Sequence, residues 1–237
     1  MGSTRLPGKV LLPLAGTSVL GCVVDRLRAA SGLDDLIVAT SLLDCDDPVV
    51  AECERLGVSS FRGSAEDVLA RYRAAAAAAG AEVVVRITSD CPLIDGEIVG
   101  ALLRDFEMGE SCDYLSNTLV RSYPRGLDTE IVRFTALERA DREAALPYER
   151  EHVTPYLYRH PERFALRAYV DPGGEDRSRM RWTVDAAEDY AFVRAVYAAC
   201  PHRAPREVGT AEVLRAIARD PSLPSLNASV RQKALGE

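Results

Sequence analysis

The sequence predicts an α/β fold in which a mostly parallel central sheet is covered by helices on both faces. Short continuous apolar runs, the pattern of strands buried on both faces, recur through the first third of the chain. Segments with helix-capping residues separate these runs, and strand–helix–strand units at this spacing join parallel strands by right-handed crossovers. At 237 residues the chain is long enough for one such domain with a sizeable core.

The first elements alternate between helix and strand. Apolar residues at 19–27 fall on one helical face, and residues 36–40 form the first buried strand. An Asp-Pro pair at 47–48 begins the next helix and Gly57 ends it, because these residue types are favoured at the two ends. A second strand follows at 58–61.

The alternation continues to about residue 110. Ser64 opens a helix with a capping-box pattern, Gly80 ends it, and a third buried strand follows at 83–87. The second half is mixed. Extended segments are predicted near residue 114 and at 129–134, 164–170 and 180–184, helices are predicted at 135–143 and 149–160, and two further helices finish the chain. We therefore read 1–237 as a single domain, whose second half, 111–237, adds a small antiparallel extension.

Composition excludes several classes of function. The chain has 29 Lys and Arg against 36 Asp and Glu, a net charge of −7, which argues against a nucleic-acid partner. Six cysteines without a Cys-x-x-Cys pair, and only three histidines, argue against a zinc site. Scattered thiols without a signal peptide predict a cytoplasmic protein. No apolar run approaches the roughly 18 residues that span a bilayer, so no membrane partner is expected.

The most informative segment is the loop at 1–9. It gathers Gly2, Ser3, Arg5 and Lys9, and such glycines, hydroxyls and cations suit a polyphosphate. It is not a P-loop, since the spacing between its glycines is longer and valine follows the lysine. The alternative is a solvated N-terminus.

This loop resembles the nucleotide-binding signature of the cytidylyltransferases that make CMP-activated sugar acids, such as acylneuraminate and Kdo cytidylyltransferases. The closest subgroup is the spore-coat polysaccharide biosynthesis proteins. Further matching motifs follow in family order: Val38-Ala-Thr-Ser41, Phe61-Arg-Gly-Ser64, Arg86-Ile-Thr-Ser-Asp-Cys-Pro-Leu-Ile94, Asp113-Tyr-Leu-Ser-Asn117, Tyr123-Pro-Arg-Gly-Leu-Asp128, Glu149-Arg-Glu-His-Val-Thr-Pro155 and Arg181-Trp-Thr-Val-Asp185. The resemblance implies a nucleotide-diphospho-sugar transferase fold, with nucleotide bound by residues 1–110 and acceptor by the second half.

Two aspartates are candidate metal ligands. Asp90 follows the strand at 83–87, and ligands of doubly wound sheets bind at the carboxyl ends of strands. Taken alone, Asp90 is equally a turn residue, and Asp185 is a helix N-cap completed by Glu188. The resemblance implies that both aspartates hold one or two Mg²⁺ ions, which prefer oxygen ligands. Asp189 is expected on the surface.

A second group of residues matches the segments that surround the cytosine base and ribose. Small residues at strand ends allow close approach to a pyrimidine, although the alternative is ordinary strand-end turns. Arg71 either reaches the same pocket or covers its helix. The residues that match are Ala39, Thr40, Arg62, Gly63 and Ser64.

Four residues are expected toward the acceptor. Arg125 suits a carboxylate or phosphonate, and Asp128 and Glu149 suit hydroxyls or an amine. His152 is as often a structural histidine as a site residue. The family also implies a homodimer.

The resemblance implies that an acceptor oxygen attacks the α-phosphorus of CTP and displaces pyrophosphate. Lys9 and Arg5 would hold the triphosphate, and Mg²⁺ at Asp90 would polarise the reacting phosphate and lower the pKa of the acceptor hydroxyl. The acceptor would be a small anionic sugar acid or, alternatively, a phosphonate or another small acid.

Two other functions stay open. A glycosyltransferase would use a nucleotide-sugar and the pair Asp44 and Asp46, although these residues more simply cap the following helix. The second is a nucleotide-binding protein that has lost its activity. Relatives place an apolar strand and an Ala-Arg pair ahead of the loop, and the sequence here begins inside the motif without them. We therefore expect the native protein to begin upstream of Met1.

Overall fold

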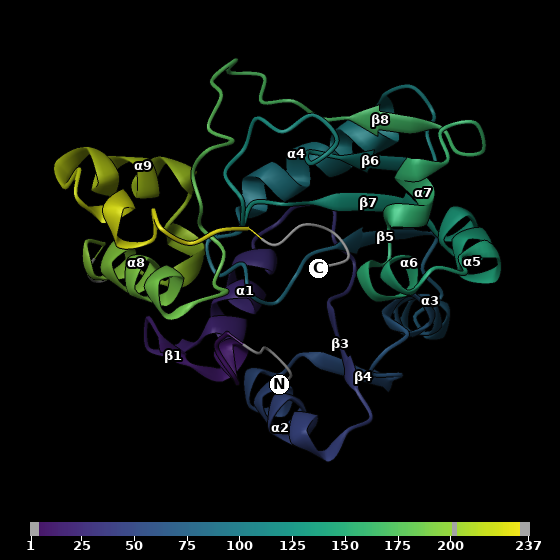
Figure 1. Cartoon of the computed structure of the whole chain (residues 1–237), viewed down its shortest axis with the longest axis horizontal. Helices are drawn as coiled ribbons and strands as arrows, with labels where there is room; N and C mark the ends of the chain where they lie inside the picture. The colour runs from purple at the N-terminus through teal and green to yellow at the C-terminus, as the bar shows by residue number, and fades with distance from the viewer. Residues whose placement is uncertain (1–4, 201–202, 233–237) are drawn as a thin grey trace.

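The computed structural model describes residues 5–200 and 203–232, and Figure 1 shows three sheets among them. The short β1 and β2 form an antiparallel hairpin, and β3 and β4 form a parallel pair. A four-stranded sheet has the order β5-β7-β6-β8. The strand bounds are Pro13–Leu14, Thr17–Ser18, Ile37–Ser41, Ser59–Gly63, Val83–Arg86, Tyr114–Ser116, Glu130–Arg133 and Leu166–Ala168, for β1 to β8 in order.

The α/β fold is confirmed, but the four-stranded sheet is mixed rather than mostly parallel. β7 lies between β5 and β6 and runs antiparallel to both, whereas β6 and β8 are parallel. A parallel neighbour would need a crossover helix, and the chain instead returns from β6 to β7 through a loop. The predicted parallel pairing holds for β3 and β4, whose register sets Ser41 opposite Gly63.

The helices of the first half lie in the predicted segments, but the third helix is capped by Asp67 and not by Ser64, so it begins later than predicted. The Ser18 side chain caps α1, Gly57 ends α2 in the left-handed conformation with φ 62°, and Asp67 caps α3. A fourth helix, α4, follows Asp95, which caps it through the Glu97 N–H. The bounds are Val19–Leu27 for α1, Asp47–Leu56 for α2, Val68–Ala78 for α3 and Gly96–Met108 for α4.

Two predictions in the second half are corrected. The helix expected over 149–160 is two short helices, because Val153 has φ 76° and Pro155 starts a new helix. The segment at 180–184 is not a strand and makes only an isolated bridge, between Arg125 and Arg181. The helices are Phe134–Glu143 for α5, Pro147–His152 for α6, Pro155–Arg159 for α7, Ala187–Ala198 for α8 and Thr210–Arg219 for α9.

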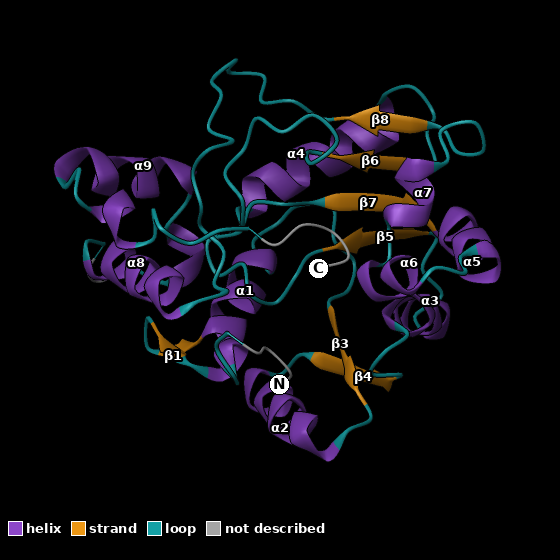
Figure 2. Cartoon of the chain, in the orientation of Figure 1, coloured by secondary structure: helices purple, strands orange, loops and turns teal. Residues whose placement is uncertain are grey.

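The four-stranded sheet buries both faces because successive side chains point in opposite directions. Leu115 and Ile131 pack with α1 and α4 in one core cluster, and Tyr114 and Val132 pack with α3, α5 and α7 in another. Helices α8 and α9 pack together in a third cluster, and Figure 2 shows them at the left of the molecule. No helix in the described ranges is long and apolar enough to cross a membrane.

A cavity of about 740 Å³ separates β3 from β5. Apolar side chains line it, among them Leu20 and Val24 of α1, Val38 of β3 and Val85 of β5. In residues 5–200 and 203–232, β3 pairs with β4 alone and β5 with β7 alone. Both strands therefore turn an edge without a strand partner toward this cavity.

Candidate active site

A lysine between two aspartates forms the centre of the candidate site. The Lys9 Nζ lies 2.6 Å from Asp90 Oδ2 and 2.8 Å from Asp185 Oδ1. Lys9 follows Gly8, whose φ of 67° turns the N-terminal loop, while Asp90 follows β5 and Asp185 precedes α8. The structure thus brings together three predicted site residues that lie far apart in the sequence.

Two arginines complete the charge balance at Asp185. Arg5 Nη2 lies 3.2 Å and Arg181 Nη2 2.7 Å from Asp185 Oδ2. Burial raises the pKa of Asp185, but Lys9, Arg181 and Arg5 outweigh it and the pKa is lowered. Burial likewise opposes the charged form of Lys9, yet Asp90 and Asp185 raise its pKa. The charged forms of Lys9 and Asp185 are therefore both favoured.

Asp189 is fully buried, which corrects its expected surface position. Its carboxylate accepts bonds from Arg181 Nε at 2.8 Å and from the Asp185 and Ala186 N–H groups at 3.0 and 3.1 Å. Asn227 donates to it as well, at 3.1 Å. Asp189, and not Glu188, therefore caps α8, and it holds Arg181 against Asp185.

Arg181 and Asp189 are the site residues that sequence reasoning missed. The sequence does carry a signal that could have placed Asp189: it is the third residue of α8. An acidic side chain at this position accepts a hydrogen bond from the backbone N–H of the N-cap residue.

The two aspartates suit a divalent metal, and a lone lysine already occupies the space between them. Carboxylate oxygens are the ligands that Mg²⁺ prefers, and Mg²⁺ commonly takes one or two carboxylates plus substrate phosphates. No group of three or more His, Cys, Asp or Glu side chains in the described residues is placed to hold a metal. Asp90 and Asp185 would therefore share an ion with water and phosphate.

The predicted base-binding residues lie at the ends of β3 and β4. Asp46 Oδ2 accepts from the Thr40 hydroxyl at 3.0 Å and from the Ser41 hydroxyl at 2.6 Å. Asp46 is buried and Asp44 is exposed, so the two carboxylates do not form a metal pair. The structure gives no support to a glycosyltransferase centre at this place.

Arg62 stabilises the loop that follows β3. Its Nε donates to the Ser41 carbonyl at 2.9 Å and its Nη2 to the Leu43 carbonyl at 3.0 Å, while Nη1 lies 2.6 Å from Asp47. The guanidinium of this predicted nucleotide-binding residue is therefore occupied by protein groups.

Gly63 and Ser64 contact Arg71, which covers the end of β4. A Cβ at Gly63 would lie 2.8 Å from the Arg71 side chain, so only glycine fits there. Arg71 also donates to the Ser64 carbonyl at 2.5 Å. Ala39 lines the cavity beside β3. The predicted residues Gly2 and Ser3 lie outside the described residues.

Arg125 carries a guanidinium that is not paired with another described residue, on a segment that bridges to Arg181. Its backbone bridges to Arg181, whose side chain contacts Asp185. In the described part of the chain its guanidinium has no hydrogen-bond or ion-pair partner, whereas neighbouring Arg121 binds Asp128 at 2.6 and 3.0 Å. Burial and the like charge of Arg121 lower the pKa of Arg125. The position is suited to an incoming anion.

The other two predicted acceptor residues lie on α6. Glu149 is buried and accepts the Ala145 and Leu146 N–H groups at 3.2 and 3.0 Å, so its carboxylate caps α6. His152 is half-buried at the end of the same helix. Of the charged groups among Arg125, Asp128 and Glu149, that of Arg125 alone has no hydrogen-bond or ion-pair partner in the described residues.

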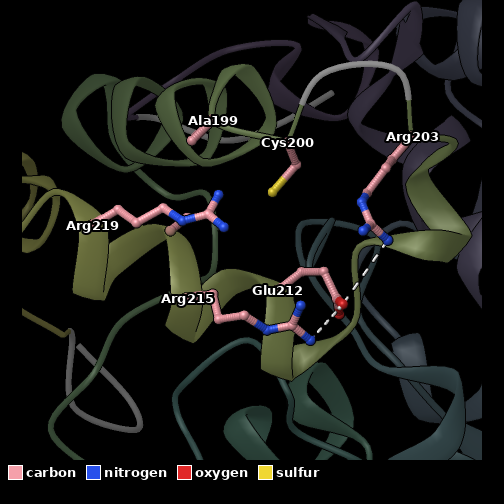
Figure 3. Close-up of a pocket in the computed structure, with 7 residues that line it drawn as sticks. Ala199, Cys200, Arg203, Glu212, Arg215 and Arg219 are labelled. Atoms are coloured by element: carbon pink, nitrogen blue, oxygen red, sulfur yellow. Dashed lines mark hydrogen bonds and ion pairs between the residues drawn. The ribbon is translucent and has the colours of Figure 1, made fainter.

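A smaller pocket of about 130 Å³ lies at α8 and α9, and Figure 3 shows its lining. Its one carboxylate, Glu212, is bound by Arg215 at 2.8 Å and lies 3.9 Å from Arg203. With no second acid among its lining residues, this pocket lacks the pair of carboxylates found at the first site.

Comparison with known proteins shows the family to which the chain belongs. The family model for cytidylyltransferases matches residues 1–198. The chain is 34% identical to the spore coat polysaccharide biosynthesis protein SpsF of Bacillus subtilis, over 93% of this chain and 92% of the relative. A solved cytidylyltransferase from Leptospira borgpetersenii serovar Hardjo-bovis has a TM-score of 0.90 at 34% identity, covering 98% of this chain and 95% of that one.

A further solved structure shares the fold alone. This CMP:2-keto-3-deoxy-manno-octonic acid synthetase, in complex with CTP, has a TM-score of 0.62 at 18% identity, over 83% of this chain and 94% of its own. The family model and the relatives at 34% identity together define a nucleotidyltransferase. The chain belongs to the cytidylyltransferase family and is a CTP-dependent enzyme of this type.

Proposed function

We propose that this enzyme transfers CMP from CTP to a small acceptor that carries an acid group, and releases pyrophosphate. The observation that carries the proposal is the Lys9, Asp90 and Asp185 centre, together with the unpaired guanidinium of Arg125, whose backbone bridges to Arg181, the partner of Asp185. An arginine without a partner binds a carboxylate or phosphonate through two parallel hydrogen bonds. Nucleotide and acid acceptor would then meet at one centre.

The residues of the centre have separate tasks in this reaction. Lys9 and Arg5 bind the triphosphate and neutralise the charge that develops on the leaving pyrophosphate. Asp90 and Asp185 would hold Mg²⁺, which supplies Lewis-acid stabilisation of the phosphates when bound. Asp189 keeps Arg181 against Asp185, so that this carboxylate stays oriented.

The chemistry balances without a covalent enzyme intermediate. A bond forms between the acceptor oxygen and the α-phosphorus of CTP, and the bond from that phosphorus to the bridging oxygen of pyrophosphate breaks. The acceptor hydroxyl loses its proton to solvent water in the same step. Such transfer is mostly positioning and charge neutralisation, which suits a centre built from ionised side chains.

The class of acceptor is supported by relatives. The spore coat relative is named for polysaccharide biosynthesis, and a solved structure of the same fold is a synthetase for a CMP-linked sugar acid. We therefore favour a sugar acid over a phosphonate. We also infer a cytoplasmic homodimer from the family, and light scattering of the purified protein tests the dimer.

The proposal is tested by thermal stabilisation with each of the four ribonucleoside triphosphates, with and without Mg²⁺. CTP at about 100 times its Kd should add roughly 2.7 kcal/mol to the free energy of unfolding. A CTP-selective shift that Mg²⁺ enhances supports the proposal. A pyrophosphate-release assay with sialic-acid-like, Kdo-like and phosphonate acceptors then identifies the acceptor. Equal shifts with all four nucleotides would contradict the CTP assignment.

A further inference from the structure

The amino group of Lys9 lies where a cation shared by Asp90 and Asp185 would bind. We propose that Lys9 is a built-in counter-cation that closes the metal site while no nucleotide is bound, and that it passes to the triphosphate when CTP arrives. Divalent metal and nucleotide would then bind cooperatively. The inference rests on the proposed function, because it takes the two aspartates as metal ligands.

The geometry makes Lys9 and a shared metal ion mutually exclusive. The Nζ contacts Asp90 Oδ2 and Asp185 Oδ1, one oxygen from each carboxylate. Mg²⁺ requires its ligand oxygens at about 2.0–2.1 Å in a near-octahedral arrangement. An ion bridging these oxygens would take the position of the ammonium, so the ammonium must leave.

Lys9 can leave while Asp185 keeps its orientation. The second oxygen of Asp185 is bound by Arg181 and Arg5, and neither arginine contacts Asp90. The backbone of Lys9 stays held by its N–H bond to the Leu6 carbonyl at 3.2 Å, so movement of the flexible side chain suffices.

Asp90 is the carboxylate that depends on Lys9. In the described residues, Lys9 is the only ion-pair partner of Asp90, and it binds Oδ2. The other oxygen of Asp90, Oδ1, accepts only from the Cys91 thiol, at 3.6 Å. A partly buried carboxylate without a cation is unfavourable, and so is an ammonium moved away from both partners. Lys9 therefore stays between the aspartates until both partners can be exchanged. Metal then takes the place of Lys9 at Asp90, and the phosphates take the place of the aspartates as partners of Lys9.

This exchange links the two ligands thermodynamically. Metal binding alone leaves the ammonium without a counter-ion, whereas metal binding with a triphosphate gives it one. Coupling between two ligands is reciprocal, with typical factors of about 5 to 150. The nucleotide-free enzyme should accordingly bind divalent metal weakly because of Lys9 itself.

The test is Mn²⁺ binding to the nucleotide-free protein, followed by electron paramagnetic resonance of the free ion. Replacing Lys9 with methionine removes the charge and keeps the length of the side chain. Lys9→Met should bind Mn²⁺ about ten-fold more tightly than the wild type, within the usual range of such couplings. Mg²⁺ should likewise raise the Tm of Lys9→Met while leaving that of the wild type unchanged.

Arg5→Met is the matched control, because it also removes one positive charge from Asp185 but from outside the space between the carboxylates. It should change Mn²⁺ affinity much less than Lys9→Met. An equal gain in both variants would show general charge repulsion and overturn the proposal. The double variant Lys9→Met, Asp90→Asn should lose the gain, and a gain that survives would overturn the assignment to Asp90.

The outcomes separate this inference from the proposed function. If CTP binds selectively but Lys9→Met gains no metal affinity, the counter-cation role is wrong and the transferase stands. If Lys9→Met gains affinity while CTP gives no stabilisation, the counter-cation role stands and the proposed function fails. If neither protein binds Mn²⁺, the counter-cation role is wrong, and the proposed function is then decided by the CTP stabilisation experiment alone.

Discussion

The centre around Lys9 and the cavity between β3 and β5 differ in whether their polar groups have partners in the described residues. At the centre, Asp185 is contacted by three cations drawn from both ends of the chain. Beside the cavity, the edges of β3 and β5 have no strand partner in the described residues, and apolar side chains face an open volume. In the described residues, the carboxylates of the first region are paired with cations, whereas the strand edges of the second region face an unfilled cavity.

This difference shows which region governs chemistry and which governs stability. The ion pairs at the centre are partly buried, and such pairs add little to folding because desolvation offsets their attraction. Apolar burial is the larger source of stability, and an unfilled cavity forgoes it. Changes at the centre should therefore alter turnover, and changes at the cavity should alter the free energy of unfolding.

The largest effect is expected for Asp90→Asn. Loss of this carboxylate removes half of the metal-binding pair, so turnover should fall by at least about 100-fold. The fold should persist because Lys9 keeps Asp185 as a partner. Pyrophosphate release measures the loss, and circular dichroism measures the fold. Asp44→Asn, at an exposed aspartate outside the centre, is the control and should keep wild-type turnover.

Arg125 tests the acceptor side of the same region. Arg125→Met removes a guanidinium that we expect to bind the acid group of the acceptor, and a charge-assisted hydrogen bond contributes about 1.5–3 kcal/mol. The KM for the acceptor should rise about 10- to 150-fold, while stabilisation by CTP should not change. A matching loss of CTP binding would place Arg125 at the nucleotide instead.

The cavity is tested by adding a strand. An arm of alternating valine and isoleucine fused ahead of Met1 should enter between β3 and β5, since both edges offer backbone partners and apolar contacts. Burial of one or two such side chains should add about 3 kcal/mol to the free energy of unfolding. That gain raises the Tm by several degrees.

The control for this experiment is the same arm with proline at alternate positions, because proline cannot donate to a strand ladder. Thermal unfolding of both fusions gives the comparison. Equal Tm values for the two arms would show that the cavity does not accept a strand, and would remove the contrast drawn between the two regions.

Local signals predicted most helices and strands, and long-range pairing escaped them. Gly57 marks the end of α2 through its own backbone, so sequence alone locates it, whereas the start of α3 was predicted at Ser64 and lies at Asp67. The position of β7 between β5 and β6 depends on side-chain packing across the domain. Helix α4 was not predicted, although its cap, Asp95, carries an ordinary signal in the sequence.

The site divides in the same way. The resemblance located Lys9, Asp90 and Asp185, and the structure shows that they meet. It could not show that Glu149 caps its own helix, because that depends on the fold of the preceding turn. Asp189 was expected on the surface although its capping bonds to the Asp185 and Ala186 N–H groups are local, and only its partner Asn227 lies far away in the sequence.

The smallest effect is expected at a charge pair remote from the proposed chemistry. Asp67 caps α3 and binds Arg150 of α6 at 3.0 and 2.5 Å. Burial raises the pKa of Asp67, but the bonds from Arg150 and the Ala70 N–H outweigh it and lower the pKa. Stability from this carboxylate is therefore present above its unfolded pKa of about 3.9 and is lost as pH falls through the lower folded value.

Asp67→Asn keeps a good helix cap and removes the titration. It should lower the free energy of unfolding at pH 7 by less than about 1 kcal/mol, because the Asp67 side chain is 35% exposed and solvent screens the pair. Once the pH has fallen below the lowered folded pKa of Asp67, the variant and the wild type should converge, since Asp67 is then protonated in both folded and unfolded chains. Urea unfolding between pH 3 and 7 measures the difference. A gap that stays constant across this range would show that shape, and not charge, holds α6 to α3.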